Sequence, residues 1–138
     1  MNIDKFVDIK CSNFDGNILQ IEFIIKHSFP TSLQWTFVME ELKELLEQLK
    51  KVNTKFFFIF DVREIGLISI DYIREFTNVM TSYSVLLESN LIANAAIAQG
   101  SIIKNIFDVI HLLYKTKKPL SVVKNMEEAL KFIKEHMD

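Results

Sequence analysis

The chain has 138 residues and a mass of 16.1 kDa, a size that fits one domain and leaves little room for two. Its 49% apolar and 25% charged residues are the balance of a globular protein, and only 3 Gly and 2 Pro exclude collagen and disordered linker arrays. A net charge of -2 gives no basic footprint for DNA or RNA. We therefore expect a single domain over residues 1–138 and no nucleic-acid partner.

The sequence also argues against a metal centre, a cofactor and a membrane span. A single cysteine cannot form an internal disulfide, and the histidines are too dispersed for zinc-ligand spacing. The start of the chain lacks the features of a signal peptide, and no apolar run approaches the roughly 20 residues that cross a bilayer. No glycine-rich nucleotide motif and no partnered nucleophile is present. We expect a cytoplasmic protein that is not an enzyme, with Cys11, His27, His111 and His136 as ordinary strand, helix or surface residues.

The first part of the chain predicts a β-hairpin. Residues 3–11 alternate apolar and polar side chains, as a half-buried strand does. Residues 13–17 contain an Asp-Gly pair, which tolerates the positive φ angles of a tight turn. A returning strand over residues 18–25 ends before Pro30, and its core face would carry Leu19, Ile21, Phe23 and Ile25.

A long amphipathic helix follows, capped by Thr31 or Ser32. Its apolar positions step by three and four residues, and its acidic side chains come early and its basic ones late, as the helix dipole favours. The apolar stripe consists of Trp35, Val38, Leu42, Leu45, Leu49 and Val52.

Two βα units come next. Residues 55–60 form a continuous apolar run, typical of a central strand covered on both faces. Ser69 can cap a single helix that continues to Leu87, and residues 94–98 form a short strand of small side chains. The helix stripe consists of Ile73, Phe76, Met80, Tyr83 and Leu87.

The chain closes with a third helix from Ser101 to Pro119, a strand over residues 120–123 and a last helix capped by Asn125. The predicted order is therefore β-β-α-β-α-β-α-β-α. This order implies an α/β fold with one mixed sheet, in which an amino-terminal antiparallel hairpin is followed by parallel neighbours joined through right-handed crossovers.

This order, together with three segments, resembles the STAS family, the domain of anti-sigma-factor antagonists and of the cytoplasmic tails of sulfate transporters. Residues 16–21 are similar to the family's second strand, residues 55–62 to its hydrophobic strand and Leu-Asp-Leu core, and residues 125–130 to its closing helix. The resemblance spans nearly the whole chain. It implies a non-enzymatic regulatory or scaffolding module whose partner is a kinase-like regulator or another STAS-type protein, with a homodimer as an alternative.

The family's phosphorylation motif differs in this chain. The family has Asp-Ser-(Ser/Ala/Gly)-Gly at the start of its second helix, where a kinase partner phosphorylates the serine. The matching residues here are Ser69, Ile70, Asp71 and Tyr72, so isoleucine stands at the modified position. A phospho-switch would therefore require Ser69 or another hydroxyl to take that role.

Polar residues are predicted to gather where the parallel strands end. Helix N-termini at this edge expose backbone N–H groups, which can be capped by serine or can bind an anion. Both interpretations remain open for Ser69 and Ser101. The candidate binding or phosphorylation residues are Arg63, Ser69, Asp71, Gly100 and Ser101, with Gln99, Lys124 and Asn125 at the same edge.

The second and third predicted helices carry more apolar residues than one face needs. These residues either fill the core, form a dimer or partner surface, or line an acyl cavity as in Sec14-like lipid carriers. The last possibility gives the alternative function, a small-molecule or lipid carrier with a Sec14-like or SpoIIAA-like fold. The residues in question are Tyr72, Val79, Leu86, Val109 and Leu112.

Overall fold

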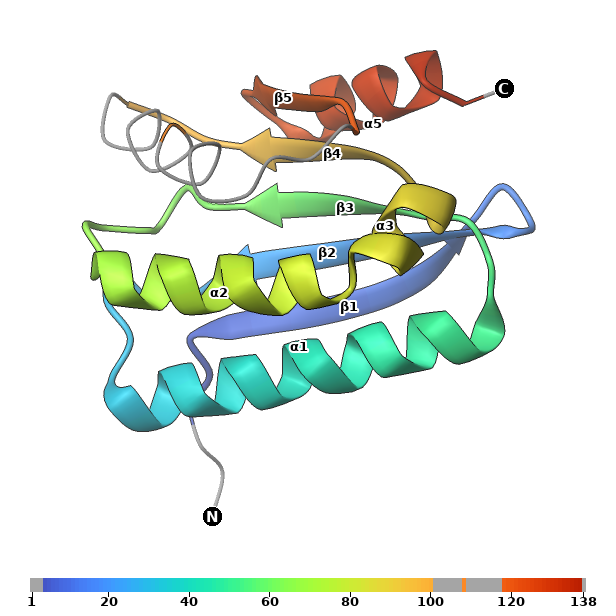
Figure 1. The fold of residues 1–138 in the computed structure, drawn as a ribbon. Helices are drawn as coiled ribbons and strands as arrows, with labels where there is room; N and C mark the ends of the chain where they lie inside the picture. The colour runs from blue at the N-terminus through green and yellow to red at the C-terminus, as the bar shows by residue number, and fades with distance from the viewer. Residues whose placement is uncertain (1–3, 101–107, 109–117, 138) are drawn as a thin grey trace.

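A computed structural model describes residues 4–100, 108 and 118–137. Five strands form one sheet in the order β1-β2-β3-β4-β5 (Figure 1). β1 and β2 are an antiparallel hairpin, and every later neighbour is parallel. The mixed α/β sheet expected from the sequence is thus confirmed. The strands are Val7–Phe14, Ile18–Ile25, Phe56–Asp61, Leu91–Ile97 and Leu120–Val123.

Helices cover both faces of the sheet. Figure 1 shows α1, α2 and α3 in front of the sheet and α5 behind β4 and β5. The helix predicted between Ser101 and Pro119 lies outside the described residues. The helices are α1 (Ser32–Val52), α2 (Ile70–Ser82), α3 (Ser84–Asn90) and α5 (Met126–Glu135).

The two helical layers pack against different surfaces of the sheet. Aromatic side chains dominate the α1–α3 side, where the Phe23 ring stacks on Phe60 and meets Phe58 edge-on, with centroids 4.9 Å and 5.3 Å apart. On the α5 side, small side chains of β4 let the helix approach closely, and Ala93, Ala95 and Ala129 are fully buried. The larger core therefore lies under α1 and α2.

The helix predicted from Ser69 to Leu87 is wrong in one respect, because it is broken at Tyr83 into α2 and α3. Two hydroxyls near the break bond back to the preceding turn, since Thr81 donates to the Thr77 carbonyl and Ser82 to the Val79 carbonyl. Such bonds compete with the helical ladder. The Tyr83 hydroxyl donates to Glu47 of α1 at 2.6 Å.

The boundaries of three predicted strands also change. β1 continues to Phe14, so the turn is confined to residues 15–17, and β3 begins one residue late and includes Asp61. β4 begins at Leu91 rather than Asn94, because Leu91 pairs with Phe56 before an irregularity shifts the register.

The stripe of α1 is shifted from the predicted one at two positions. Leu46 is fully buried where Leu45 is only partly buried, and Val52 is 57% exposed. The 21 residues of α1 extend about 31 Å, whereas the 6 residues of β3 extend about 20 Å. α1 is therefore longer than the strand β3. No helix within the described ranges is both long and apolar enough to cross a membrane.

Candidate interaction surface at the carboxyl edge of the sheet

The carboxyl ends of β2, β3, β4 and β5 point to one edge of the sheet, on the left in Figure 1. The loop of residues 26–31 leaves β2 there and leads into α1. The loop of residues 62–69 leaves β3 and leads into α2. Both helices lie on the same face, so these two loops are neighbours.

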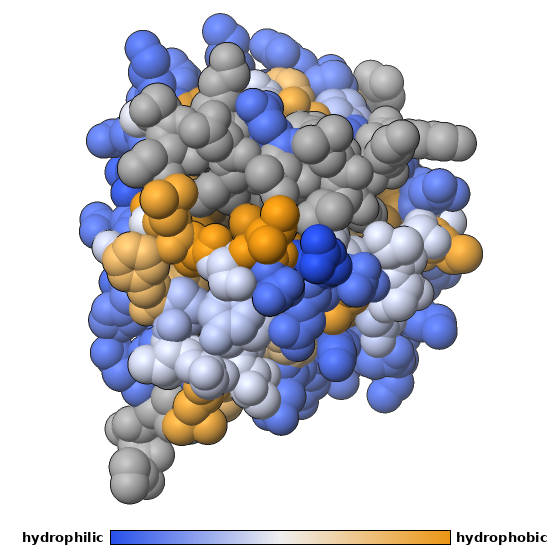
Figure 2. All heavy atoms as spheres, turned by 60° about the vertical axis from the view of Figure 1, so that its left-hand side comes forward, coloured by the Kyte–Doolittle hydropathy of each residue, from blue (hydrophilic) through white to orange (hydrophobic). Residues whose placement is uncertain are grey.

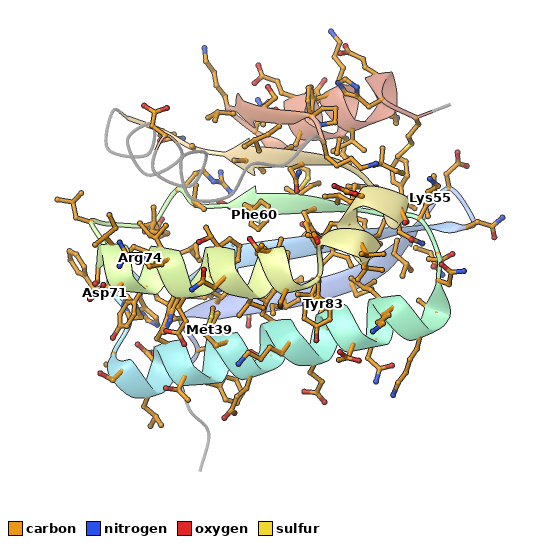
Figure 3. The ribbon with its side chains drawn as sticks, viewed as in Figure 1. Met39, Lys55, Phe60, Asp71, Arg74 and Tyr83 are labelled. Atoms are coloured by element: carbon orange, nitrogen blue, oxygen red, sulfur yellow. The ribbon has the colours of Figure 1, made fainter. Side chains whose placement is uncertain are left out.

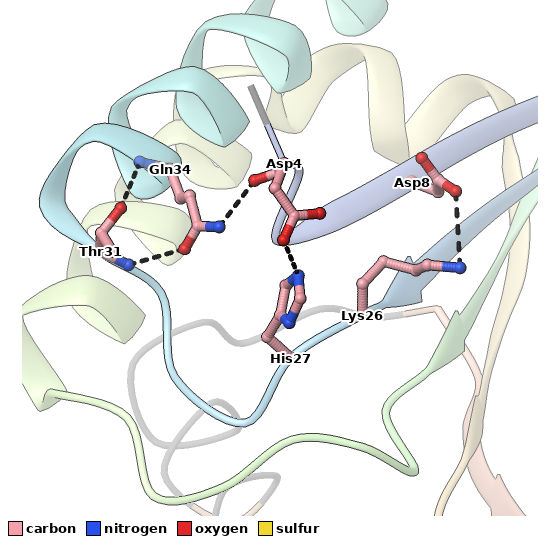
Figure 4. A network of polar contacts seen from close by, with 6 residues as sticks. All are labelled: Asp4, Asp8, Lys26, His27, Thr31 and Gln34. Carbon is pink, nitrogen blue, oxygen red and sulfur yellow. Dashed lines mark hydrogen bonds and ion pairs between the residues drawn. The ribbon is translucent and has the colours of Figure 1, made fainter. Parts of the chain in front are cut away.

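The loop before α1 is held by the amino-terminal segment (Figure 4). The Lys26 N–H donates to the Phe6 carbonyl at 2.8 Å, and His27 Nε2 lies 2.9 Å from Asp4 Oδ2. At the helix start, Thr31 and Gln34 form a capping box, and Gln34 Nε2 also donates to the Asp4 carbonyl at 2.6 Å. The loop is thus fixed at both ends by polar contacts.

The loop before α2 begins with a short-range ion pair. The Arg63 guanidinium donates to both oxygens of Asp61, at 2.9 and 2.7 Å. These hydrogen bonds hold the pKa of the Asp61 carboxyl below its usual value. Arg63 is therefore already occupied by a bidentate carboxylate and does not face an open anion site.

Ser69 is the N-cap of α2. Its Oγ accepts a hydrogen bond from the Asp71 N–H at 3.1 Å, and the residue is exposed. Asp71 and Arg74 lie on the outer side of the first turns of α2 (Figure 3), where Arg74 Nη1 is 3.4 Å from Asp71 Oδ1. The charges of this turn are thus paired with each other.

The two loops meet at Gly66. Its N–H donates to the Ser28 carbonyl at 2.9 Å, and a Cβ at this position would lie 3.0 Å from the Phe29 ring. Glycine permits this close approach.

Three large apolar side chains are exposed beside this contact, and we call them the edge patch. Phe29 is 62% exposed, Leu67 is 65% exposed and Ile70 is 52% exposed. Figure 2, which brings this side of the molecule forward, shows hydrophobic side chains gathered on it. Contiguous exposed apolar surface of this kind is typical of a contact site.

The predicted site residues do not all come together. Gly100 follows β4 with a φ of +84° and is exposed, and Ser101 lies outside the described residues. Asn125 caps α5 by accepting from the Glu128 N–H, but α5 lies on the other face of the sheet from α2. The helix N-termini at Ser69 and Asn125 therefore do not converge on one anion.

Three residues of the predicted apolar surplus lie in the core. Val79 and Leu86 are buried, and the Tyr72 ring stacks on Trp35 with centroids 4.7 Å apart. These side chains pack within or against the core, which agrees with the first of the three interpretations. Val109 and Leu112 lie outside the described residues.

The edge patch was missed by the sequence reasoning. Phe29 and Leu67 fall in loops without helical or strand periodicity, and Ile70 at the start of α2 lies outside its apolar stripe, so no pattern places them in the core. The signal that could have found Phe29 and Leu67 is a large apolar residue next to Pro30 or Gly66, in a loop where polar residues are expected.

No cluster of His, Cys, Asp and Glu suited to a metal ion occurs in the part of the chain that the structure describes. Cys11 is an exposed residue of β1. Partial burial of its thiol nevertheless raises the pKa of that thiol. A raised pKa disfavours the thiolate, which is the nucleophilic form.

No family model and no curated protein sequence matches the chain. A solved structure is similar to it over 96% of this chain and 97% of the other, with a TM-score of 0.64 and 15% identity. That structure is of an uncharacterized DUF3478-family protein from Shewanella loihica PV-4, described as having a SpoIIAA-like fold. The resemblance predicted from the sequence is thus confirmed at the level of fold: this chain has a SpoIIAA-like fold.

Proposed function

We propose that the protein is a non-enzymatic regulatory module that binds a protein partner through the edge patch. The observation that carries this proposal is the exposure of Phe29 and Leu67, on two loops that are joined through Gly66, and of Ile70 at the start of α2. Large apolar side chains held on an ordered surface are the usual anchors of protein interfaces.

The charges near the edge patch define the partner's chemistry. Arg63 is paired with Asp61, and Arg74 with Asp71. Paired charges offer little to a strongly charged ligand, so the partner surface that fits is apolar at its centre and polar at its rim. A protein of the kinase-regulator or STAS type has the size to present such a surface.

Ser69 is the residue through which this surface would be regulated. A kinase would transfer the γ-phosphate of ATP to the exposed Oγ, forming an O–P bond, releasing ADP and losing the hydroxyl proton. The added charge of about -2 stabilises the N-terminus of α2 and repels the nearby Asp71 carboxylate. Since Ile70 of the edge patch follows directly, modification would change the partner's contact.

Paired variants test the binding surface. The double variant Leu67→Glu/Ile70→Glu removes two apolar anchors, and Val85→Glu is the matched control because Val85 is 78% exposed on α3, outside the patch. Quantitative mass spectrometry of proteins purified with each variant should show a partner lost from the double variant and retained by the control. Identical recovery with both variants would refute the edge patch as the binding surface.

Two substitutions at Ser69 separate charge from capping. Aspartate and asparagine both cap helices well, but only aspartate adds a charge. Once the partner is identified, Ser69→Asp should change its affinity and Ser69→Asn should not, as measured by calorimetry. Equal affinities would reject the phospho-switch while leaving the binding surface in place.

A further inference from the structure

We propose that β1 pairs with β1 of a second copy of this chain, so that two sheets join antiparallel into one. This inference goes beyond the edge patch and concerns another side of the molecule. β1 is the first strand in the sheet order and is hydrogen-bonded to β2 on one side. Within the described residues no strand pairs with its other side. An unpaired strand edge is a template for another strand.

The backbone groups that would form the pairing can be identified. The Lys26 N–H donates to the Phe6 carbonyl, so the backbone N–H and C=O of Phe6 point toward β2. In an antiparallel strand the N–H and C=O of one residue point to the same side, and this side alternates along the chain. The outward groups therefore belong to Val7, Ile9, Cys11 and Asn13.

This edge is accessible over its second half. Lys10, Cys11, Ser12 and Asn13 are all exposed, and Asp8 and Ile9 are partly buried. The strand is 8 residues long, longer than the 4-residue β5 at the opposite end of the sheet. It carries no proline, which would prevent pairing.

The charges of β1 select one register and fit a second copy of the same strand. When Ile9 lies opposite Ile9 of the second copy, Asp8 lies opposite Lys10 of that copy, and the reverse pair forms by symmetry. A shift of the second strand by two residues in either direction places Asp8 opposite Asp8 or Lys10 opposite Lys10. Opposite charges across a strand pair are favourable and like charges are unfavourable. The strand is therefore complementary to itself in one register.

The new ion pairs would lie on the face of the sheet away from α1. Val7 and Ile9 pack toward α1, so Asp8 and Lys10 point to the other face. On that face Asp8 lies 3.8 Å from Lys26, and Lys10 is opposite Glu22. Pairing with a second copy adds Lys10 of that copy beside each Asp8 and Asp8 of that copy beside each Lys10. Neither residue then has a like charge directly opposite it.

Complementary charge variants test this pairing. Analytical ultracentrifugation should show the wild-type chain as a dimer at tens of micromolar. Lys10→Glu alone and Asp8→Lys alone place like charges opposite each other, so each should weaken the dimer about tenfold or more. An equimolar mixture of these two variants restores both opposite-charge pairs and should form a heterodimer. Lys43→Glu on the exposed side of α1 is the control and should leave the dimer unchanged.

A disulfide test reads the register directly. The proposed register places the two Ile9 Cα atoms about 5.5 Å apart, within the range of a disulfide. Ile9→Cys/Cys11→Ser should therefore form a covalent dimer on mild oxidation, while the wild-type Cys11 should not, because Val7 lies opposite it. Circular dichroism spectra confirm that each variant is folded.

Four results would overturn the proposal. A wild-type monomer at hundreds of micromolar would exclude the dimer. A dimer that tolerates Lys10→Glu, or a mixture of the two charge variants that stays monomeric, would exclude this interface. Cross-linking through Cys11 in place of Ile9→Cys would exclude this register.

Discussion

At the amino ends of β3 and β4 polar side chains bond to one another. At the carboxyl edge of the sheet, three large apolar side chains face solvent in the loops after β2 and β3 and at the start of α2. Asn90 is buried, and its Nδ2 donates to Asn53 Oδ1 at 3.3 Å and to the Thr54 carbonyl at 3.1 Å. Lys55 adds a bond to the Ser89 carbonyl. The carboxyl end instead exposes the edge patch. One end therefore contributes buried polar contacts to the fold, whereas the other carries the proposed binding surface.

The largest effect on stability is expected at the amino end. Asn90→Ala removes both hydrogen bonds and leaves their acceptors without this partner, so the free energy of unfolding should fall by about 1–3 kcal/mol. Urea unfolding measures it. Asn78→Ala, at an exposed position of α2, is the matched control and should change stability by less than about 0.5 kcal/mol. Equal stability of the two variants would remove the contrast between the ends.

A smaller loss is expected at the cap of α2. Ser69→Ala removes the acceptor for the Asp71 N–H and should cost about 1 kcal/mol, while Ser69→Asn keeps a capping oxygen and should be nearly neutral. Urea unfolding of the three proteins side by side measures this. A loss of the same size in the asparagine variant would show that the cap is not the cause.

The Asp61–Arg63 pair should make stability depend on pH. The lowered pKa of the Asp61 carboxyl means that its ionised form favours the folded state. The ion pair therefore contributes to the free energy of unfolding above the ordinary pKa of aspartate. It is lost as the pH falls through the lower pKa of the folded state. Because the pair is partly exposed, we expect less than about 1 kcal/mol.

Thermal unfolding between neutral and acidic pH tests this dependence. Asp61→Asn should unfold with a shallower acid dependence than the wild type. Glu64→Gln, in the same loop, is the control because it lies outside the ion pair. Parallel pH profiles for Asp61→Asn and the wild type would contradict the prediction.

The smallest effect is expected at Gly66. A Cβ there meets the tip of the Phe29 ring, which is exposed and can turn away, and it also lies 3.2 Å from the Ser28 carbonyl. Gly66→Ala should therefore cost only a few tenths of a kcal/mol and should displace the ring. Chemical denaturation and the NMR shifts of the Phe29 ring measure both results. An unmoved ring would mean that the loops are not in contact.

The sequence predicted the elements whose patterns are local. The alternation of residues 18–25 placed β2 at its observed bounds, and Asn125 was correctly chosen as the cap of α5. The break at Tyr83 could not be predicted from periodicity, because apolar spacing continues across it. It coincides with hydroxyl bonds from Thr81 and Ser82 and with the contact of Tyr83 to Glu47 on α1.

The candidate site was predicted less completely. Ser69 stood out because capping depends on the residues directly after it. Phe29 and Leu67 did not, because their proximity depends on the hydrogen bond between Gly66 and Ser28, which lie in different loops. A contact between loops leaves no periodic pattern in the sequence.

The bond between Gly66 and Ser28 has a consequence for how fast and how tightly a partner can bind. The polar contacts at Asp4 and Lys26 restrict one loop, and Gly66 ties the second loop to it. Much of the conformational entropy of these loops is therefore lost during folding and not on association. A preorganised surface of this kind favours rapid docking with little rearrangement, so a modest number of apolar contacts can be enough for a specific complex.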